Sequence, residues 1–181
     1  EDGNLPAKAT AFEAFPIRAT VFREGHDCYA AEAVLLRPGG SIHSRALMRD
    51  IAPGLDRYEA WVMPDAVGQW SFRIDTWSDP YATWRHDASV KIGAGVDVEL
   101  MLEEGALLME RAARGEALNN PSQTQPTRSA IDTLLDAAKG LRNTAQTPQR
   151  RLSTGLSAPV RAVFRQFPLR DLYGYTRTYP L

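Results

Sequence analysis

The stretch DTWSDPYATWRHD, residues 75–87, holds side chains that could carry out acid–base or metal chemistry. His86, with Asp79 and Asp87 close in the sequence, could supply a general acid or base or a set of metal ligands. Metal sites of this type use several histidine or cysteine ligands, and the stretch offers one histidine and no cysteine. The stretch is therefore weak evidence for a metal site.

A structural interpretation of the same stretch is favoured. Asp-Pro at 79–80 is a turn signal, and large tryptophans are expected where a sheet packs against another element. We expect a strand that ends at Trp77 and a second strand that returns from Thr83. The residues expected on one face of the returning strand are Trp84, His86, Ala88, Val90 and Ile92.

The other two histidines lack the partners that catalysis needs. His26 stands beside Asp27 in a glycine-containing turn, and the sequence contains no Gly-x-Ser-x-Gly motif that would supply a nucleophile. Cys28 is too close to His26 along an expected strand to form a catalytic pair with it. We expect His26 in a surface turn, and His43 lies in an expected loop and carries no signal.

Three further groups could be taken for ligand sites. The run RPGGS at 37–41 lacks the Lys-Ser/Thr ending of a phosphate loop and precedes no helix, so we expect a hairpin loop. Glu103 and Glu104 would point about 100° apart on a helix, which predicts a solvated face. A basic segment could touch a phosphorylated ligand or an acidic neighbour, although a mobile basic loop is the ordinary interpretation. Its arginines are Arg142, Arg150 and Arg151.

None of these groups combines a nucleophile, a base, an orienting group and an oxyanion donor. We therefore assign no catalytic residue, no cofactor-binding residue and no metal ligand, and we expect no cofactor.

Composition bounds the class of protein. The chain has 181 residues, of which 44% are apolar and 24% charged, as expected of a globular domain with an appendage. The net charge of −1 offers no basic excess for a nucleic-acid partner. The single cysteine, Cys28, excludes an intrachain disulfide and favours a reducing, cytoplasmic setting. No long apolar run or signal-like segment occurs, so we expect no membrane partner and no export.

Residues 1–95 show apolar residues at every second position, the period of a half-buried strand. Turn formers such as Arg37-Pro38-Gly39-Gly40 separate the runs. Short strands without intervening helices predict an antiparallel β-sandwich of the immunoglobulin or fibronectin type. The residues expected in its core are Ile17, Ala19, Val21, Ala31, Ala33, Leu35, Tyr58, Ala60, Val62, Trp70, Phe72, Ile74 and Thr76.

Residues 96–170 change to the helical period, and we expect two to three helices packed on the sandwich. The first should begin after Asp97 and end at Gly115, and the second should cover 127–142. A short third helix should begin at Ser157, with Pro159 in its first turn.

Three other parts of this half are expected to lack helix. Residues 119–126 read as a linker, and 143–155 as a polar, mobile stretch. The end, 171–181, is expected to be an extended tail.

Three segments resemble a known family: FPIRATVFREGHD (15–27), a long run at 52–92 that contains WSDPYATWRHD, and DVELMLEEGALLMERA (97–112). They are similar to the N-terminal domain of bacterial α-1,4-glucan:maltose-1-phosphate maltosyltransferases, members of the α-amylase clan in glycoside hydrolase family 13. The resemblance extends over about residues 6–170.

The resemblance implies a division of labour. The full enzymes extend α-1,4-glucan by transfer of maltosyl from α-maltose 1-phosphate, with catalytic carboxylates in a (β/α)₈ barrel that follows this domain. A barrel needs about 250 residues and is absent from this chain, so its tail would lead toward a missing catalytic domain. The family also implies an immunoglobulin-like sandwich with helices, a homodimer, and a non-catalytic function in assembly and positioning, within α-glucan biosynthesis.

Two other functions stay open. A free-standing carbohydrate-binding β-sandwich could stack sugars, or contact α-glucan, on exposed aromatics such as Trp61 and Trp77, and a lane of exposed tryptophans would support it. A small hydrolase using His26, His86 and nearby aspartates would require activity in the isolated chain.

Overall fold

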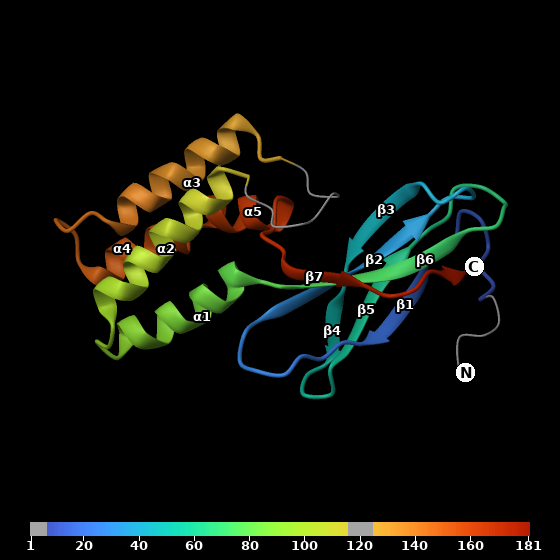
Figure 1. The fold of residues 1–181 in the computed structure, drawn as a ribbon, viewed down its shortest axis with the longest axis horizontal. Helices are drawn as coiled ribbons and strands as arrows, with labels where there is room; N and C mark the ends of the chain where they lie inside the picture. Colours follow the sequence, from blue (N-terminus) through green and yellow to red (C-terminus); the bar gives the residue numbers. More distant parts are fainter. Residues whose placement is uncertain (1–6, 116–124) are drawn as a thin grey trace. The chain divides into compact units, whose positions relative to one another are not determined.

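The computed structural model describes residues 7–115 and 125–181. Those residues form eight strands and five helices (Figure 1). The chain divides into two compact units. One, here named the sandwich unit, contains Glu1–Trp77 and Leu172–Leu181, and the other, named the helical unit, is the continuous segment Ser78–Asp171. The expected boundary near residue 95 falls inside the helical unit, and the packing of the helices on the sandwich stays a prediction.

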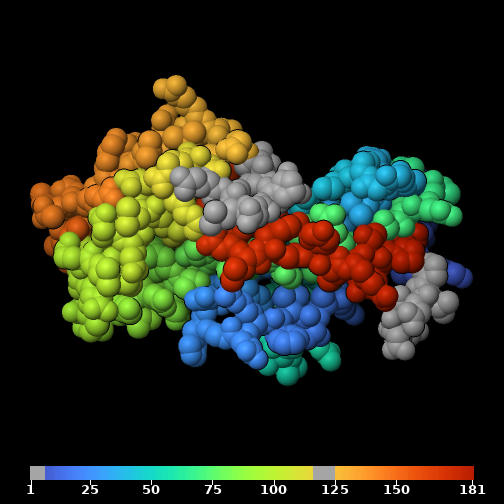
Figure 2. All heavy atoms as spheres, in the orientation of Figure 1, coloured from blue at the N-terminus to red at the C-terminus, as the bar shows by residue number. Residues whose placement is uncertain are grey.

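The sandwich unit is built from two sheets, which confirms the predicted fold class of a β-sandwich with appended helices. The three-stranded sheet has the order β1 (Phe15–Thr20), β5 (Arg57–Val62), β4 (Arg49–Ala52). The five-stranded sheet has the order β3 (Ile42–Leu47), β2 (Tyr29–Leu36), β6 (Ser71–Ser78), β7 (Asp171–Tyr175), with β8 (Tyr179–Pro180) also paired to β6. Figure 2 shows the C-terminal residues as a red band at the molecular surface.

The core of the sandwich unit contains most of the residues that the period-two pattern predicts, whereas Ala19, Tyr58, Phe72 and Thr76 are only partly buried. Ile17 of β1 lies opposite Ala60 of β5, and both belong to one buried cluster with residues of β2 and β6. Trp70 is only 4% exposed. Both sheets contribute residues to this cluster, among them Ala31, Ala33, Leu35, Val62 and Ile74.

Strand β2 departs from the expected alternation, because its second face is also buried. Glu32 and Val34, expected to face solvent, are 4% and 0% exposed. Strand β2 lies between β3 and β6, so its backbone groups are paired on both sides.

The strand expected from Thr83 is wrong: Pro80–Gly93 form helix α1. Asp79 accepts a hydrogen bond from the backbone N–H of Ala82 at 2.9 Å, and Pro80 occupies the first turn. Asp-Pro therefore begins a helix here, because a side-chain oxygen followed by a residue without N–H suits a helix start. Trp84, Ala88 and Ile92 are four residues apart, a spacing that fits one face of a helix as well as one face of a strand.

The three expected helices are present as α2 (Val98–Ala113), α3 (Arg128–Leu141) and α5 (Ala158–Gln166). Asp97 precedes α2 with a left-handed backbone (φ 50°) and makes no side-chain capping bond. Of the expected linker, residues 119–124 lie outside the described part of the chain.

The segment expected to be mobile contains helix α4 (Pro148–Gly155), which corrects that prediction. Thr147 accepts a hydrogen bond from the N–H of Arg150 at 3.3 Å, and Pro148 starts the helix. Its composition is polar because it buries few apolar side chains, and a charged one, Arg151, takes an inward position at 5% exposure.

The helices of this unit share one apolar core. Tyr81 of α1 stacks on Phe164 of α5, with ring centroids 4.0 Å apart. Trp84 of α1 donates its ring N–H to the carbonyl of Met101 on α2 at 2.7 Å. A methyl group at Gly105 would lie 2.2 Å from the Trp84 ring, so glycine lets α1 and α2 approach closely. None of the described helices has the length and apolar character that crossing a bilayer requires.

Candidate functional site

The structure separates the candidates in residues 75–87. The Asp79 carboxylate caps α1, and burial raises the pKa of this carboxyl. His86 and Asp87 are exposed about two turns further along the helix. Within residues 7–115 and 125–181, no three His, Cys, Asp or Glu side chains are grouped so that they could hold a metal ion. The stretch therefore contains the beginning of helix α1.

The other histidines also lie apart from each other. His26 and Asp27 are exposed between β1 and β2, and Asp27 pairs with Arg23 at 3.4 Å. Cys28 is half-buried. His43 belongs to β3, where its Nδ1 lies 3.7 Å from Asp65 and its ring meets Trp70 edge-on.

The run at 37–41 is the hairpin loop between β2 and β3, as predicted. The N–H of Arg37 bonds the carbonyl of Ser41 at 2.8 Å, and the N–H of Gly40 bonds the carbonyl of Arg37 at 2.9 Å. Gly39 and Gly40 have φ of 93° and 89°, which glycine adopts readily. Two of the loop's amides are thus used within the loop.

Two of the three candidate arginines bind carboxylates of α2. Arg142 donates to Glu103 at 2.7 and 2.8 Å and also to Glu110, and these bonds lower the pKa of both carboxyls. Arg151 donates to Glu99 at 2.7 and 2.9 Å and to the carbonyl of Leu141 at 2.7 Å.

Arg142 and Arg151 thus contact acidic neighbours, one of the two contacts considered for the basic segment, whereas Arg150 is exposed. The acidic partners were missed from the sequence. Glu99, Glu103 and Glu110 recur at helical spacing, a pattern that could have indicated one acidic face on α2.

A buried polar cluster in the sandwich unit was also missed. Asp75 is 0% exposed, and its carboxylate accepts hydrogen bonds from Arg73 (2.7 Å), Tyr173 (2.5 Å) and Arg45 (3.2 Å). Arg45 also donates to Glu32. These side chains belong to β2, β3, β6 and β7, the neighbouring strands of one sheet.

In this cluster, hydrogen bonds to the Asp75 carboxylate compensate for its burial. Burial works to raise the pKa of the Asp75 carboxyl, but the hydrogen bonds from Arg73 and Tyr173 outweigh it and hold the pKa below its ordinary value. An ionised carboxylate surrounded by donors is a poor proton acceptor, so this arrangement suits a structural function. The sequence signal was weak, since Asp75 and Tyr173 are far apart in the chain.

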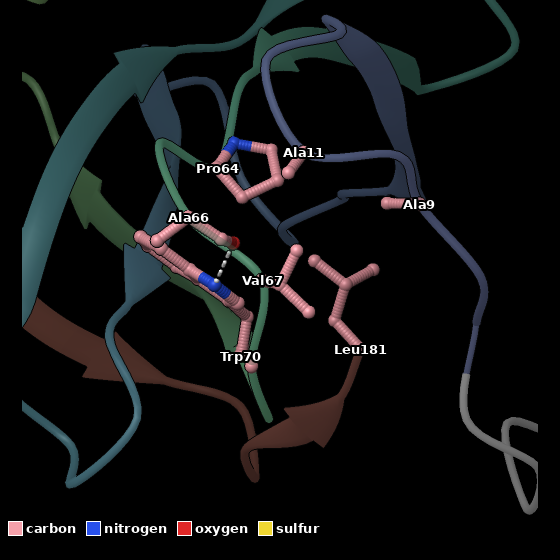
Figure 3. Close-up of a pocket in the computed structure, with 8 residues that line it drawn as sticks. Ala9, Ala11, Pro64, Ala66, Val67, Trp70 and Leu181 are labelled. Atoms are coloured by element: carbon pink, nitrogen blue, oxygen red, sulfur yellow. Dashed lines mark hydrogen bonds between the residues drawn. The ribbon is translucent and has the colours of Figure 1, made fainter.

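The sandwich unit contains a small cavity of about 100 Å³ (Figure 3). Its lining side chains are apolar apart from the ring N–H of Trp70, which donates to the carbonyl of Ala66 at 2.9 Å, and polar backbone atoms supply a large part of its surface. Sites for small molecules usually measure about 300–1,000 Å³, so this cavity is too small for a sugar chain. The lining residues are Ala9, Ala11, Pro64, Ala66, Val67, Gly68, Trp70 and Leu181.

The four tryptophans do not form an exposed lane. Trp61 is 58% exposed on β5 and donates its ring N–H to Glu59 at 3.0 Å. Trp77, the other residue suggested for sugar stacking, is 3% exposed, and Trp70 and Trp84 are 4% and 6% exposed. The observation that would have supported a carbohydrate-binding surface is therefore missing.

The matching family model and the similar curated proteins belong to the same family. The family model described as alpha-1,4-glucan:maltose-1-phosphate maltosyltransferase, domain N/S, matches residues 1–181. Similar curated proteins include alpha-1,4-glucan:maltose-1-phosphate maltosyltransferase 2 of Streptomyces coelicolor, 45% identical over 181 residues, 100% of this chain and 26% of the relative. The enzyme of Arcanobacterium haemolyticum is 39% identical over 180 residues, 99% of this chain and 25% of the relative.

A more distant relative, the Mycobacterium tuberculosis enzyme of the same name, is 34% identical over 195 aligned residues, 94% of this chain and 26% of the relative. The chain thus spans about a quarter of the length of the curated relatives it matches. Because the family model covers the whole chain, the protein belongs to the N/S-domain family of alpha-1,4-glucan:maltose-1-phosphate maltosyltransferases and corresponds to their N-terminal domain.

Proposed function

We propose that the chain is the non-catalytic N-terminal part of a maltosyltransferase that uses maltose 1-phosphate as donor and α-1,4-glucan as acceptor. The observation that carries the proposal is the family match over residues 1–181, together with relatives about four times as long that bear this activity in their names. The catalytic groups would lie in the remaining polypeptide. The proposed process is α-glucan synthesis in the cytoplasm, a location that the single cysteine favours.

The side chains of the described residues support a structural function. The buried Asp75 carboxylate and the Arg142 and Arg151 guanidinium groups are held by partners within their own unit. These groups stabilise strands and helices, so they are poorly placed to bind a phosphorylated sugar.

The test compares the full-length polypeptide with residues 1–181. Each is incubated with α-maltose 1-phosphate and an α-1,4-glucan acceptor, and inorganic phosphate is measured, one phosphate for each maltosyl group transferred. We expect phosphate only from the full-length polypeptide. Heat-sensitive phosphate release from residues 1–181 would show that this piece is itself catalytic.

We further propose that the domain assists homodimer assembly and so positions the catalytic part. Helix α2 supports this proposal, because Leu100 and Leu107 are 54% and 52% exposed and lie two turns apart on one side of the helix. Exposed leucines arranged in this way are suited to meeting a second copy of the same helix.

Sedimentation of full-length variants tests the assembly. Leu100→Glu combined with Leu107→Glu should convert dimer to monomer, because two buried carboxylates would face the partner. Leu135→Glu, at a 37% exposed leucine of α3, is the matched control and should leave the dimer intact. A wild-type polypeptide that is monomeric at high concentration would contradict the proposal.

One observation favours an α-glucan contact as an alternative function: the hydrogen bond to Glu59 fixes the exposed Trp61 ring on the sheet. Electrophoresis through a gel that contains glycogen tests it. Trp61→Ala should then lose retardation, whereas Phe22→Ala, at an aromatic residue 73% exposed in a loop, should keep it. Equal migration with and without glycogen would remove this alternative.

A further inference from the structure

The first and last described residues of the sandwich unit meet at one end of it. The N–H of Ala7 donates to the carbonyl of Pro180 at 3.3 Å, and the N–H of Leu181 donates to the carbonyl of Trp70 at 2.8 Å. The N–H of Phe12 donates to the carbonyl of Pro64 at 2.8 Å. Three segments, 7–12, 63–70 and 179–181, therefore form one surface, here named the apolar end.

Large apolar side chains are exposed at the apolar end. Val67 is 93% exposed and Phe12 is 70% exposed. Phe12 also has φ of 66°, a conformation that a bulky residue adopts rarely and at some cost in free energy. Exposure of this kind is unfavourable in water, so a covering surface would stabilise the apolar end.

The cavity opens at the same place. Figure 3 shows the side chains of Val67 and Leu181 pointing toward one another at its wall. The cavity measures about 100 Å³, and its lining side chains are apolar apart from the ring N–H of Trp70. These apolar side chains make an apolar side chain the occupant to expect.

We propose that the apolar end is the docking surface for the polypeptide that continues beyond Leu181 in the full-length maltosyltransferase, and that this polypeptide places an apolar side chain in the cavity. The inference rests on the proposed function. Its occupant follows from position: the chain matches about a quarter of each relative, and Leu181 lines the cavity from which the following residues would leave.

Thiol labelling of the full-length protein tests this surface. Val67→Cys is compared with Leu55→Cys, an aliphatic residue 65% exposed in the turn at the opposite end of β5. Labelling is followed peptide by peptide in a mass spectrometer, which separates both sites from Cys28. We expect Val67→Cys to react at least about tenfold more slowly than Leu55→Cys in the folded protein, and equally fast in urea.

Two outcomes would overturn the inference. Equal labelling in the folded protein removes the docking surface. Protection of Val67→Cys that disappears on dilution assigns the surface to a second copy, which also overturns it. Equal labelling in a full-length protein that releases phosphate normally leaves the proposed function intact, whereas a full-length protein without phosphate release removes that function.

A second measurement does not depend on cysteine. Val67→Asp should lower the thermal unfolding midpoint of the full-length protein, because a carboxylate would be buried at the interface, and Leu55→Asp should not. Equal midpoints for the two variants would count against the docking surface.

Discussion

Asp75 belongs to the stretch 75–87 that was considered for acid–base or metal chemistry, and its carboxylate stabilises the fold. Its carboxylate is fully buried and joins β6 to β3 through Arg45 and to β7 through Tyr173. A buried charge without partners is costly, so each donor around it offsets the loss of water.

Removing this charge should be severe. Asp75→Asn leaves Arg73 without its carboxylate and Arg45 with Glu32 alone, and we expect a loss of about 3–5 kcal/mol in the free energy of unfolding. Tyr173→Phe removes one hydrogen bond to a charged group and should cost about 1.5–3 kcal/mol. Denaturant unfolding measures both, with Asp136→Asn as an exposed control expected near zero. An unchanged midpoint for Asp75→Asn would show that the cluster does not stabilise the fold.

The same carboxylate should make stability depend on pH. An unfolded aspartate has a pKa of about 3.9, and the folded pKa of Asp75 lies lower, so its contribution is present above the unfolded pKa and is lost as pH falls through the folded pKa. The stability gap between wild type and Asp75→Asn should therefore be constant from about pH 7 to 5 and shrink below about pH 4. Unfolding midpoints across this range test the sign, and a gap that widens in acid would contradict it.

At the scale of elements, close approach decides how α1 and α2 pack. Gly105 leaves room for the Trp84 ring, and Trp84 bonds the α2 backbone at Met101. A glycine inside a helix costs about 1 kcal/mol relative to alanine, so its place here is explained by contact with the ring.

The corresponding prediction is that alanine at position 105 destabilises the chain, although alanine has a higher helix propensity than glycine. Gly105→Ala should destabilise the chain by about 1–3 kcal/mol, because the new methyl group overlaps Trp84. Gly93→Ala is the matched control at the end of α1, where no atom beyond the neighbouring turn of the helix lies within 4 Å of the added carbon, and it should be neutral or stabilising by up to about 1 kcal/mol. Equal effects of the two substitutions in thermal unfolding would contradict the packing argument.

At the scale of the whole molecule, the helical unit is an insertion between two strands of the sandwich. Strand β6 ends at Ser78, β7 begins at Asp171, and the two are neighbours in the five-stranded sheet. Tyr179 of β8 lies opposite Phe72, and Tyr173 of β7 bonds Asp75, so the returning segment runs antiparallel to β6.

This connectivity predicts that the insertion can be removed. Joining Ser78 to Asp171 through Asn-Gly, a turn suited to antiparallel strands, should leave a sandwich that unfolds cooperatively. Circular dichroism during denaturation measures the transition. A variant that lacks residues 172–181 as well should lose cooperativity, because β7 and β8 are gone. Loss of cooperativity in the first variant would mean that the sandwich needs its insertion.

The sequence by itself determined the sandwich and the apolar stripes of α2, α3 and α5. These features are local: period-two and helical spacing depend on neighbouring residues, and so do the hairpin at 37–41 and the core positions of β1, β2, β5 and β6. The resemblance carried by WSDPYATWRHD also came from the sequence, and the family model confirmed it.

The tertiary structure decided what local spacing left open. Residues four apart fit both a strand and a helix, and only the cap at Asp79 with packing on α2 made α1 helical. Strands β4 and β7 carry too few residues for a periodic signal, β3 has no fully buried residue, and α4 is held by Arg151 through distant partners. In the Asp75 cluster, Asp75 and Tyr173 are 98 positions apart in the chain, and at the apolar end Trp70 and Leu181 are more than a hundred apart. Contacts of that range exist only once the chain has folded.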